Sequence, residues 1–165
     1  MSSTVFIMGA GTSKCAGAPL MADFLDRAEG LLQNGRVNLV ADEFQKVFDA
    51  IGKLQAVHSK AQLDIKNIEA VLTTFEMAKI LGKFPGYNAD EIEGLIKAAK
   101  TLIFKTLENT IDFPISEGKI SPPKPHHDFA VLLTRLQQEA TPKQTVSIVT
   151  FNYDILFDLL FFSME

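Results

Sequence analysis

Two short runs of strand-forming residues, one near each end of the chain, constrain the fold more than any other feature. Residues 4–8 (TVFIM) and 145–151 (TVSIVTF) are rich in β-branched, aliphatic and aromatic side chains. A run that is apolar on both faces is typical of a strand buried in a parallel sheet. Because such a sheet normally has about five or six strands, two are too few. We therefore expect the 165 residues to be the N-terminal part of a larger α/β fold, completed by further chain or by a partner.

Amphipathic helices are expected to fill most of the chain between these runs. Apolar residues recur at the helical period over residues 20–32, 37–54, 68–80 and 92–107. Pro19 suits the first position of the first helix, and Asn88 with Glu91 is typical of a capping box before the fourth. The pattern predicts a helical insertion over about residues 20–142 within one domain, residues 1–165.

A loop and two more helices are expected after these four. Four of the seven prolines lie in residues 113–125, which predicts a loop that ends the helical block. A fifth helix is expected over residues 128–138. The stretch 155–162 is apolar nearly all round, which predicts a helix that further chain would bury.

Composition and charge argue against several classes of protein. The 16 basic and 20 acidic side chains leave a net charge of −4, which does not favour general electrostatic binding to nucleic acid. Cys15 is the single cysteine, so an internal disulfide and a four-cysteine zinc module are excluded. Because no apolar run reaches the roughly 18 residues of a membrane helix, we expect a soluble, cytoplasmic protein with no nucleic-acid or membrane partner.

The glycine-rich segment 9–19 (GAGTSKCAGAP) follows the first predicted strand directly. Glycines allow a sharp turn and a close approach of a pyrophosphate, and free N–H groups at a helix start attract phosphate charge. The dinucleotide fingerprint G-x-G-x-x-G is met in part, because Gly9 and Gly11 fit but Lys14 replaces the third glycine. A P-loop is excluded, since no Gly-Lys-Ser/Thr closes the segment. A glycine-rich turn without a ligand stays an open alternative at this point.

The complete loop sequence narrows the interpretation. The string Gly9-Ala10-Gly11-x-Ser13-x-x-x-Gly17-x-Pro19 resembles the sirtuin (SIR2) signature G-A-G-x-S-x-x-x-G-x-P at every fixed position. Thr150-Phe151-Asn152-Tyr153-Asp154 is similar to the second sirtuin signature, T-Q-N-I-D, and also follows a predicted strand. Both motifs most resemble the SIR2-like NAD-consuming domains of bacterial antiphage defence proteins. The resemblance covers the two ends of the chain, and it implies a Rossmann-like parallel sheet with a large helical insertion.

The resemblance also implies a role for each matching residue. The residues that would line the diphosphate and adjoining ribose of NAD⁺ are Gly9, Ala10, Gly11, Thr12 and Ser13. Gly17 and Pro19 would shape the loop over the nucleotide. Asn152 would lie beside the nicotinamide ribose and help to hold the attacking water, Asp154 would support the nicotinamide pocket, and Thr150 belongs to the same motif. These positions agree with the rule that open α/β sheets bind ligands at the carboxyl ends of strands. No metal is implied.

Departures from the sirtuin pattern bear on the implied activity. Leu20-Met21-Ala22 stands where sirtuin deacylases have Asp-Phe-Arg, Phe151 replaces a glutamine, and one cysteine cannot form the structural zinc ribbon. These differences favour NAD⁺ hydrolysis, or binding alone, over protein deacylation. The family's general-base histidine comes after the Asn-x-Asp motif, but none of the eleven residues after Asp154 is a histidine. We therefore expect turnover only if the chain continues past Glu165.

Three functional hypotheses follow from these motifs. In the first, the complete domain hydrolyses NAD⁺ to nicotinamide and ADP-ribose in antiphage defence, with a second copy or a C-terminal domain completing the fold. In the second, the domain senses NAD or ADP-ribose without catalysis. In the third, the chain is a helical interaction domain whose glycine-rich loop binds no nucleotide.

Two other groups of polar side chains are interpreted as structural. His126, His127 and Asp128 are expected in an extended segment, where adjacent histidines point in different directions, so a solvated loop is favoured over a metal site. Cys15 could be a reactive thiol near a helix start, but a small packed residue is the expectation.

Overall fold

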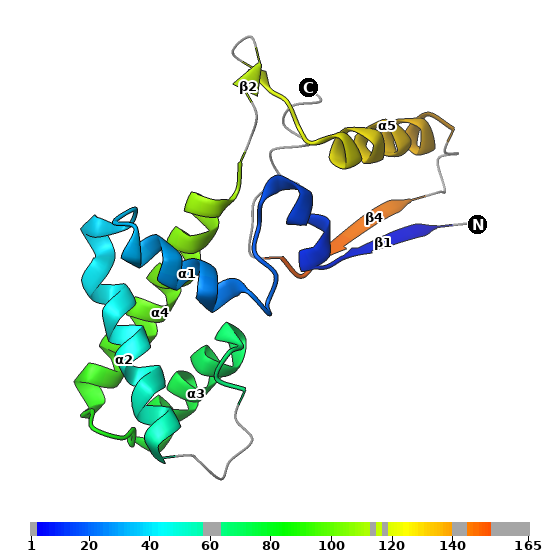
Figure 1. The fold of residues 1–165 in the computed structure, drawn as a ribbon. Coiled ribbons are helices and arrows are strands. Elements are labelled where there is room, and N and C mark those ends of the chain that lie inside the picture. The colour runs from blue at the N-terminus through cyan, green and yellow to red at the C-terminus, as the bar shows by residue number, and fades with distance from the viewer. Residues whose placement is uncertain (1–2, 58–63, 113–114, 117–118, 140–144, 153–165) are drawn as a thin grey trace. The chain divides into compact units, whose positions relative to one another are not determined.

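The computed structural model of the chain describes residues 3–57, 64–112, 115–116, 119–139 and 145–152. Two compact units make up the chain, and each is described by itself (Figure 1). One unit, which we call the strand unit, combines Met1–Leu20 with Ile111–Glu165. The other, the helical unit, is Met21–Thr110. No helix among the described residues has both the length and the apolar character needed to cross a membrane.

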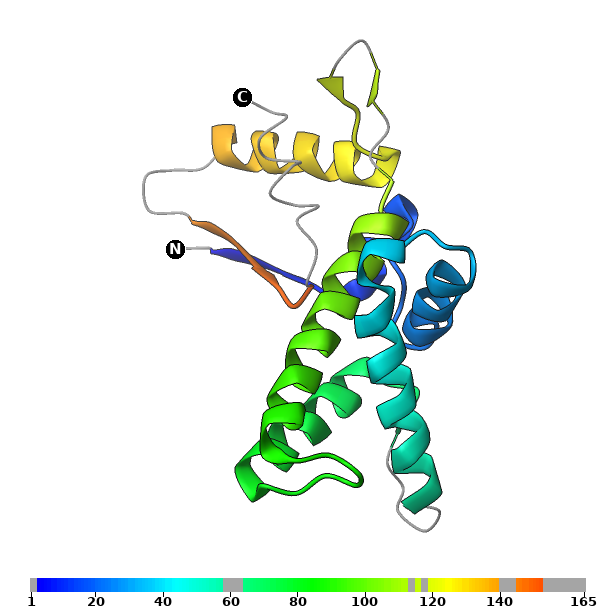
Figure 2. The same cartoon turned by 90° about the vertical axis from the view of Figure 1, so that its left-hand side faces the viewer.

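A two-stranded parallel sheet lies at the centre of the strand unit. Strand β1 (Thr4–Met8) pairs with β4 (Val146–Thr150), and the register runs from Thr4 opposite Val146 to Met8 opposite Thr150. Figures 1 and 2 show the two strands side by side. Both predicted strands are therefore confirmed. A small parallel sheet in a mostly helical chain is compatible with the expected α/β class.

Helix α5 (Lys124–Glu139) packs on one face of this sheet. The rings of Phe6 and Phe129 meet edge to face with their centroids 5.1 Å apart, and Met8 packs against Ala130. This helix groups with the strands, so the predicted insertion over 20–142 is longer than the compact helical unit, which ends at Thr110. Helix α5 also begins at Lys124, four residues before the start predicted at residue 128.

The opposite face of the sheet is largely exposed in the part of the chain that the structure describes. Exposure reaches 57% at Val5, 71% at Ile7, 42% at Val149 and 72% at Phe151. The expectation of strands buried on both faces is therefore wrong for the described residues. The reason is that α5 covers only the face that carries Phe6 and the other even-numbered residues of β1.

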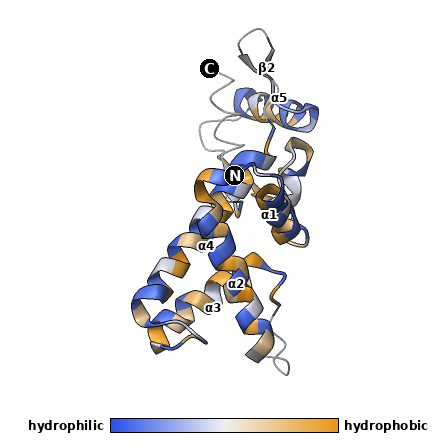
Figure 3. Ribbon diagram, turned by 60° about the vertical axis from the view of Figure 1, so that its left-hand side comes forward, coloured by the Kyte–Doolittle hydropathy of each residue, from blue (hydrophilic) through white to orange (hydrophobic). Residues whose placement is uncertain are grey.

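The described residues of the helical unit form four helices. They are α1 (Phe24–Gln33), α2 (Ala41–Val57), α3 (Ile68–Leu81) and α4 (Ala89–Thr110). A short 3-10 turn, η3 (Asn38–Val40), precedes α2. Helix α4 contacts each of the other three, and Figure 2 shows it running beside α2. Figure 3 shows apolar and polar residues alternating along these helices, as the amphipathic pattern predicts.

Apolar side chains of these four helices meet in one core. Its most deeply buried members are Ala28, Phe44, Val47, Ala50, Leu54, Ile68, Val71, Phe75, Ile92, Leu95, Ala99 and Leu102. Most of them occupy the periodic positions that the sequence singles out, so the predicted core of this unit is confirmed.

The ends of the helices agree with the sequence in one case and differ in another. The capping box before α4 is confirmed, because the N–H of Glu91 donates to Asn88 Oδ1 (3.0 Å) and the N–H of Asn88 donates to Glu91 Oε2 (2.7 Å). The predicted start of the first helix at Pro19 is wrong. Pro19 is buried in the loop, and α1 begins at Phe24, with the carbonyl of Asp23 accepting from the N–H of Arg27.

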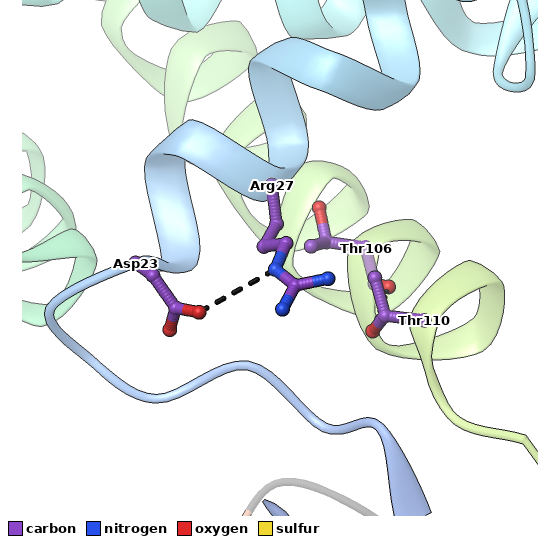
Figure 4. Close-up of polar contacts among 4 residues, drawn as sticks. All are labelled: Asp23, Arg27, Thr106 and Thr110. Carbon is purple, nitrogen blue, oxygen red and sulfur yellow. Dashed lines mark hydrogen bonds and ion pairs between the residues drawn. The ribbon is translucent and has the colours of Figure 1, made fainter.

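Four polar residues, Asp23, Arg27, Thr106 and Thr110, lie near one another where α1 and α4 meet (Figure 4). Asp23 and Arg27 form an exposed ion pair (3.4 Å), and Arg27 extends towards Thr106 and Thr110 of α4. The hydroxyl of Thr110 donates to the carbonyl of Thr106 (2.7 Å). Thr106 is fully buried, and its own hydroxyl has no hydrogen-bond partner among the described residues. A buried hydroxyl without a partner costs roughly 1–3 kcal/mol, so Thr106 is a weak point of this core.

The remaining predicted elements lie in the loop and near the C-terminus. The proline-rich loop contains a minimal antiparallel pair, β2 (Ile115–Ser116) with β3 (Lys119–Ile120). The helix predicted over residues 155–162 lies outside the described residues.

Candidate functional site

The carboxyl ends of β1 and β4 place the two sequence motifs beside each other. Met8 and Thr150 are the last register pair, so the glycine-rich loop and Asn152 follow the sheet at the same edge. The N–H of Phe151 donates to the carbonyl of Met8 (3.1 Å), which extends the pairing by one residue. Parallel pairing alone therefore brings together two motifs from opposite ends of the sequence.

The glycine-rich loop consists of two consecutive 3-10 turns, η1 (Ala10–Thr12) and η2 (Lys14–Ala16). The segment is therefore a tight connection, as the sharp turn expected from its glycines requires. The loop ends at Gly17, whose φ of 88° lies in the left-handed region. A residue with a Cβ is strained there, so the backbone itself requires this glycine. Buried Ala16 and Ala18 flank Gly17, and with buried Pro19 they anchor the end of the loop.

Two other glycines of the loop have a different reason to be glycine. A Cβ added at Gly9 or at Gly11 would meet no atom within 4 Å, and the backbone of Gly9 is extended. Neither position therefore needs glycine to avoid a neighbouring side chain. Gly9, Ala10 and Gly11 are all exposed. Bare backbone facing open space is the arrangement that lets a ligand approach the chain closely.

Asn152 connects the two motifs directly. Its side-chain amide nitrogen donates to Thr12 Oγ1 (3.1 Å) and to Ser13 Oγ (3.0 Å). The backbone N–H of Asn152 donates to Thr150 Oγ1 (3.1 Å), and Thr12 Oγ1 in turn donates to the carbonyl of Gly9 (2.7 Å). Ser13 is fully buried. The carboxamide is therefore held in one orientation by two hydroxyls from the other motif.

The oxygen of the same carboxamide is left without a partner. Asn152 Oδ1 is buried and accepts no hydrogen bond from the described part of the chain. Leaving a buried acceptor unsatisfied costs roughly 1–3 kcal/mol, and functional sites are where such groups are found. A water molecule or a ligand hydroxyl that donates to Oδ1 would remove this cost. The atom is thus a fixed acceptor next to the glycine-rich loop.

A pocket of about 330 Å³ lies between the loop and the first turn of α5. Its lining is Met8, Gly11, Thr12, Cys15, Pro125, His126 and Phe129. Cys15 is exposed, and its sulfur lies 3.3 Å from Nδ1 of His126, which is only 3% exposed. The expectation that Cys15 is a small packed residue is therefore wrong.

The two histidines also lie in a helix and not in the expected extended segment. The N–H groups of His126 and His127 both donate to the carbonyl of Pro123 in the first turn of α5. Pro125 is tolerated in this first turn because the N–H groups there have no partner within the helix. A proline at this position is typical of a helix start, so Pro125 was the sequence signal for a helix that begins before residue 128. No group of three or more metal-ligating side chains occurs among the described residues.

The structure brings together most of the residues that the sequence predicts for the site. The loop residues Gly9–Ser13, Thr150 and Asn152 lie at one sheet edge, and Gly17 and Pro19 close the loop. Asp154 and Tyr153 lie outside the described residues. The Cys15–His126 contact was not predicted, because the two residues are 111 positions apart and only the packing of α5 joins them.

Comparisons with known proteins identify no relative of the chain. No protein-family model, no curated protein and no solved structure matches the chain.

Proposed function

We propose that the chain is the N-terminal part of a SIR2-like domain with a Rossmann-like sheet, which binds NAD⁺ at the edge where β1 and β4 end. The single observation that carries this proposal is the pair of hydrogen bonds from Asn152 to Thr12 and Ser13. It joins the two motifs whose sequences resemble the two sirtuin signatures.

The glycine-rich loop would hold the pyrophosphate end of the nucleotide. Exposed backbone at Gly9, Ala10 and Gly11 faces open space, so phosphate oxygens could approach the main chain. The resemblance implies that residues 9–13 line the diphosphate and the adjoining ribose, and fully buried Ser13 would contribute through its hydrogen bond with Asn152. The net charge of −4 does not oppose this, because backbone amides and hydroxyls would bind the anion without a basic patch.

Asn152 would act at the nicotinamide end. Because its amide nitrogen is held by two hydroxyls, its oxygen Oδ1 is fixed in place and free to accept from water or from a ribose hydroxyl. Cleavage of the bond between ribose and nicotinamide develops oxocarbenium character, and an oriented water next to a polar amide lowers that barrier. We propose that the complete domain hydrolyses NAD⁺ to nicotinamide and ADP-ribose in this way.

The exposed apolar face of the sheet favours the proposal that the chain is part of a larger domain. Val5, Ile7, Val149 and Phe151 form an apolar patch that further strands and helices, or a second copy, would cover. We place the general base of hydrolysis in chain beyond Asp154, in agreement with the family pattern. A cytoplasmic location and a role in antiphage defence are part of the same proposal and rest on the resemblance.

A second candidate function is nucleotide sensing without turnover. It requires only the loop and the Asn152 contacts that the structure describes, and no general base. In this case the same residues would bind NAD⁺ or ADP-ribose, and nicotinamide would not be released.

Calorimetric titration with NAD⁺, ADP-ribose and ATP tests the proposal. We expect saturable binding of NAD⁺ to the wild-type chain, weaker binding of ATP, and at least tenfold weaker NAD⁺ binding to Asn152→Ala, about 1.4 kcal/mol. Asn34→Ala, which changes an exposed asparagine at the end of α1, is the matched control and should bind as the wild type does. Equal binding by Asn152→Ala and wild type, or no binding at all, would contradict the proposal.

Nicotinamide release separates hydrolysis from sensing. A chain that extends past Glu165 is incubated with NAD⁺, and the products are separated by liquid chromatography. Nicotinamide and ADP-ribose in equal amounts, abolished by Asn152→Ala, are expected for the hydrolase. Saturable binding without either product would identify the sensor.

A further inference from the structure

A thiol and an imidazole form a pair at the pocket beside the glycine-rich loop. Cys15 Sγ lies 3.3 Å from Nδ1 of His126, which is within hydrogen-bond reach for sulfur. Cys15 is exposed, whereas His126 is 97% buried and lines the same pocket. We propose that Cys15 is a reactive thiol that exchanges with small disulfides, with His126 as the base that takes its proton.

The surroundings hold the imidazole in position to accept this proton. The N–H of His126 donates to the carbonyl of Pro123, and the burial of the ring restricts its orientation. With the ring proton on Nε2, Nδ1 is an acceptor that faces the sulfur. The other sulfur contact, to the carbonyl of Thr12, is longer, at 3.6 Å.

The proposed thiol–disulfide exchange needs no reagent besides the small disulfide itself. The thiol proton of Cys15 moves to His126 Nδ1 while the sulfur attacks one sulfur of the small disulfide. A new S–S bond forms to Cys15, the original S–S bond breaks, and the departing thiolate takes the proton from the imidazolium. Cys15 is oxidised to a mixed disulfide, and the small disulfide is reduced to one bound half and one free thiol.

The pocket has the size and the lining that this substrate class needs. Its volume of about 330 Å³ leaves room for a small organic group next to the sulfur. Met8, Pro125 and Phe129 give it an apolar wall, and exposed Gly11 also lines it. A metal site is the weaker interpretation, because the pair supplies two ligands and the described residues add no third.

The reaction of the chain with 5,5′-dithiobis(2-nitrobenzoate), an aromatic disulfide, tests this inference. Cys15 is the single cysteine, so the coloured thiolate that is released reports on this residue alone. We expect the folded chain to react at least about tenfold faster than the chain unfolded in urea, with N-acetylcysteine in the same buffers correcting for the solvent. An equal or slower rate in the folded chain would overturn the inference.

A pair of adjacent histidine variants assigns the effect to His126. His126→Gln should slow the reaction of the folded chain by about tenfold or more. His127→Gln changes the exposed neighbour on the same helix turn and should leave the rate unchanged. An unchanged rate in His126→Gln, or equal losses in both variants, would contradict the role of His126. The comparison of folded and unfolded wild type decides the reactivity of Cys15 if His126→Gln does not fold.

Discussion

Asn152 and Ser13 are 139 positions apart in the sequence, yet the side-chain amide of one donates to the hydroxyl of the other across 3.0 Å. The serine is fully buried, and the strands that precede the two residues end opposite each other. The contact therefore depends on the parallel pairing of β1 and β4 and cannot form without it. Each motif is held in place by the other.

This contact predicts an energetic coupling between the two residues. Asn152→Ala and Ser13→Ala should each lower the free energy of unfolding, and the double variant should lose less than the sum of the two. A hydrogen bond of this kind contributes about 0.5–1.5 kcal/mol, which is the coupling that a double-mutant cycle in urea should give. Strictly additive losses would mean that the two side chains do not meet in solution.

Gly17 and Gly11 of the loop are expected to respond differently to substitution by alanine. Gly17→Ala should destabilise the fold by about 1 kcal/mol or more, because a Cβ at a φ of 88° is strained. Gly11→Ala should change the free energy of unfolding by less than about 0.5 kcal/mol, since its Cβ would face open space. Urea unfolding followed by circular dichroism measures both. A loss at Gly11 as large as the loss at Gly17 would contradict the described loop.

The open space at Gly11 predicts a binding defect without a folding defect. Gly11→Val would place two methyl groups where the nucleotide is proposed to approach the backbone, so NAD⁺ binding should weaken at least about tenfold, or 1.4 kcal/mol. The thermal midpoint without nucleotide should stay within a few degrees of the wild type. Gly94→Val, on an α4 position that also has open space, is a control for the added side chain. Unchanged affinity in Gly11→Val would place the nucleotide elsewhere.

The unpartnered hydroxyl of Thr106 predicts a stabilising substitution. Thr106→Val keeps the shape of the side chain and removes a buried polar group, so it should raise the free energy of unfolding by about 1 kcal/mol. Thr101→Val changes a half-buried threonine of the same helix and should have little effect. Denaturant unfolding of the two variants gives the comparison. A loss of stability in Thr106→Val would show that the hydroxyl has a partner.

The position of Cys15 predicts protection by nucleotide, and this rests on the proposed function. Gly11 and Thr12 belong both to the proposed nucleotide loop and to the pocket of Cys15. Saturating NAD⁺ should therefore slow the reaction of Cys15 with the aromatic disulfide by fivefold or more, which corresponds to about 1 kcal/mol. A fast reaction that NAD⁺ does not slow would count against the nucleotide site and not against the thiol. A slow reaction without NAD⁺ would count against the thiol alone.

Local features of the chain could be predicted where a short pattern specifies them. The two strands, the core positions of α2, α3 and α4, and the capping box of Asn88 and Glu91 depend on residues close together in sequence. The start of α1 could not be predicted in the same way. Pro19 is compatible with a helix start, but it is buried in the loop, and the helix begins only at Phe24.

Contacts between residues far apart in the sequence could be learned only from the tertiary structure. Only the structure shows that α5 covers one sheet face and leaves Val5 and Ile7 exposed, or that His126 meets Cys15. A periodic pattern tells which side of a helix is apolar, but it does not tell which surface that side will cover. The two motifs themselves were therefore readable from the residues, whereas the contacts of Asn152 and the contact between Cys15 and His126 exist only once strands and helix have packed.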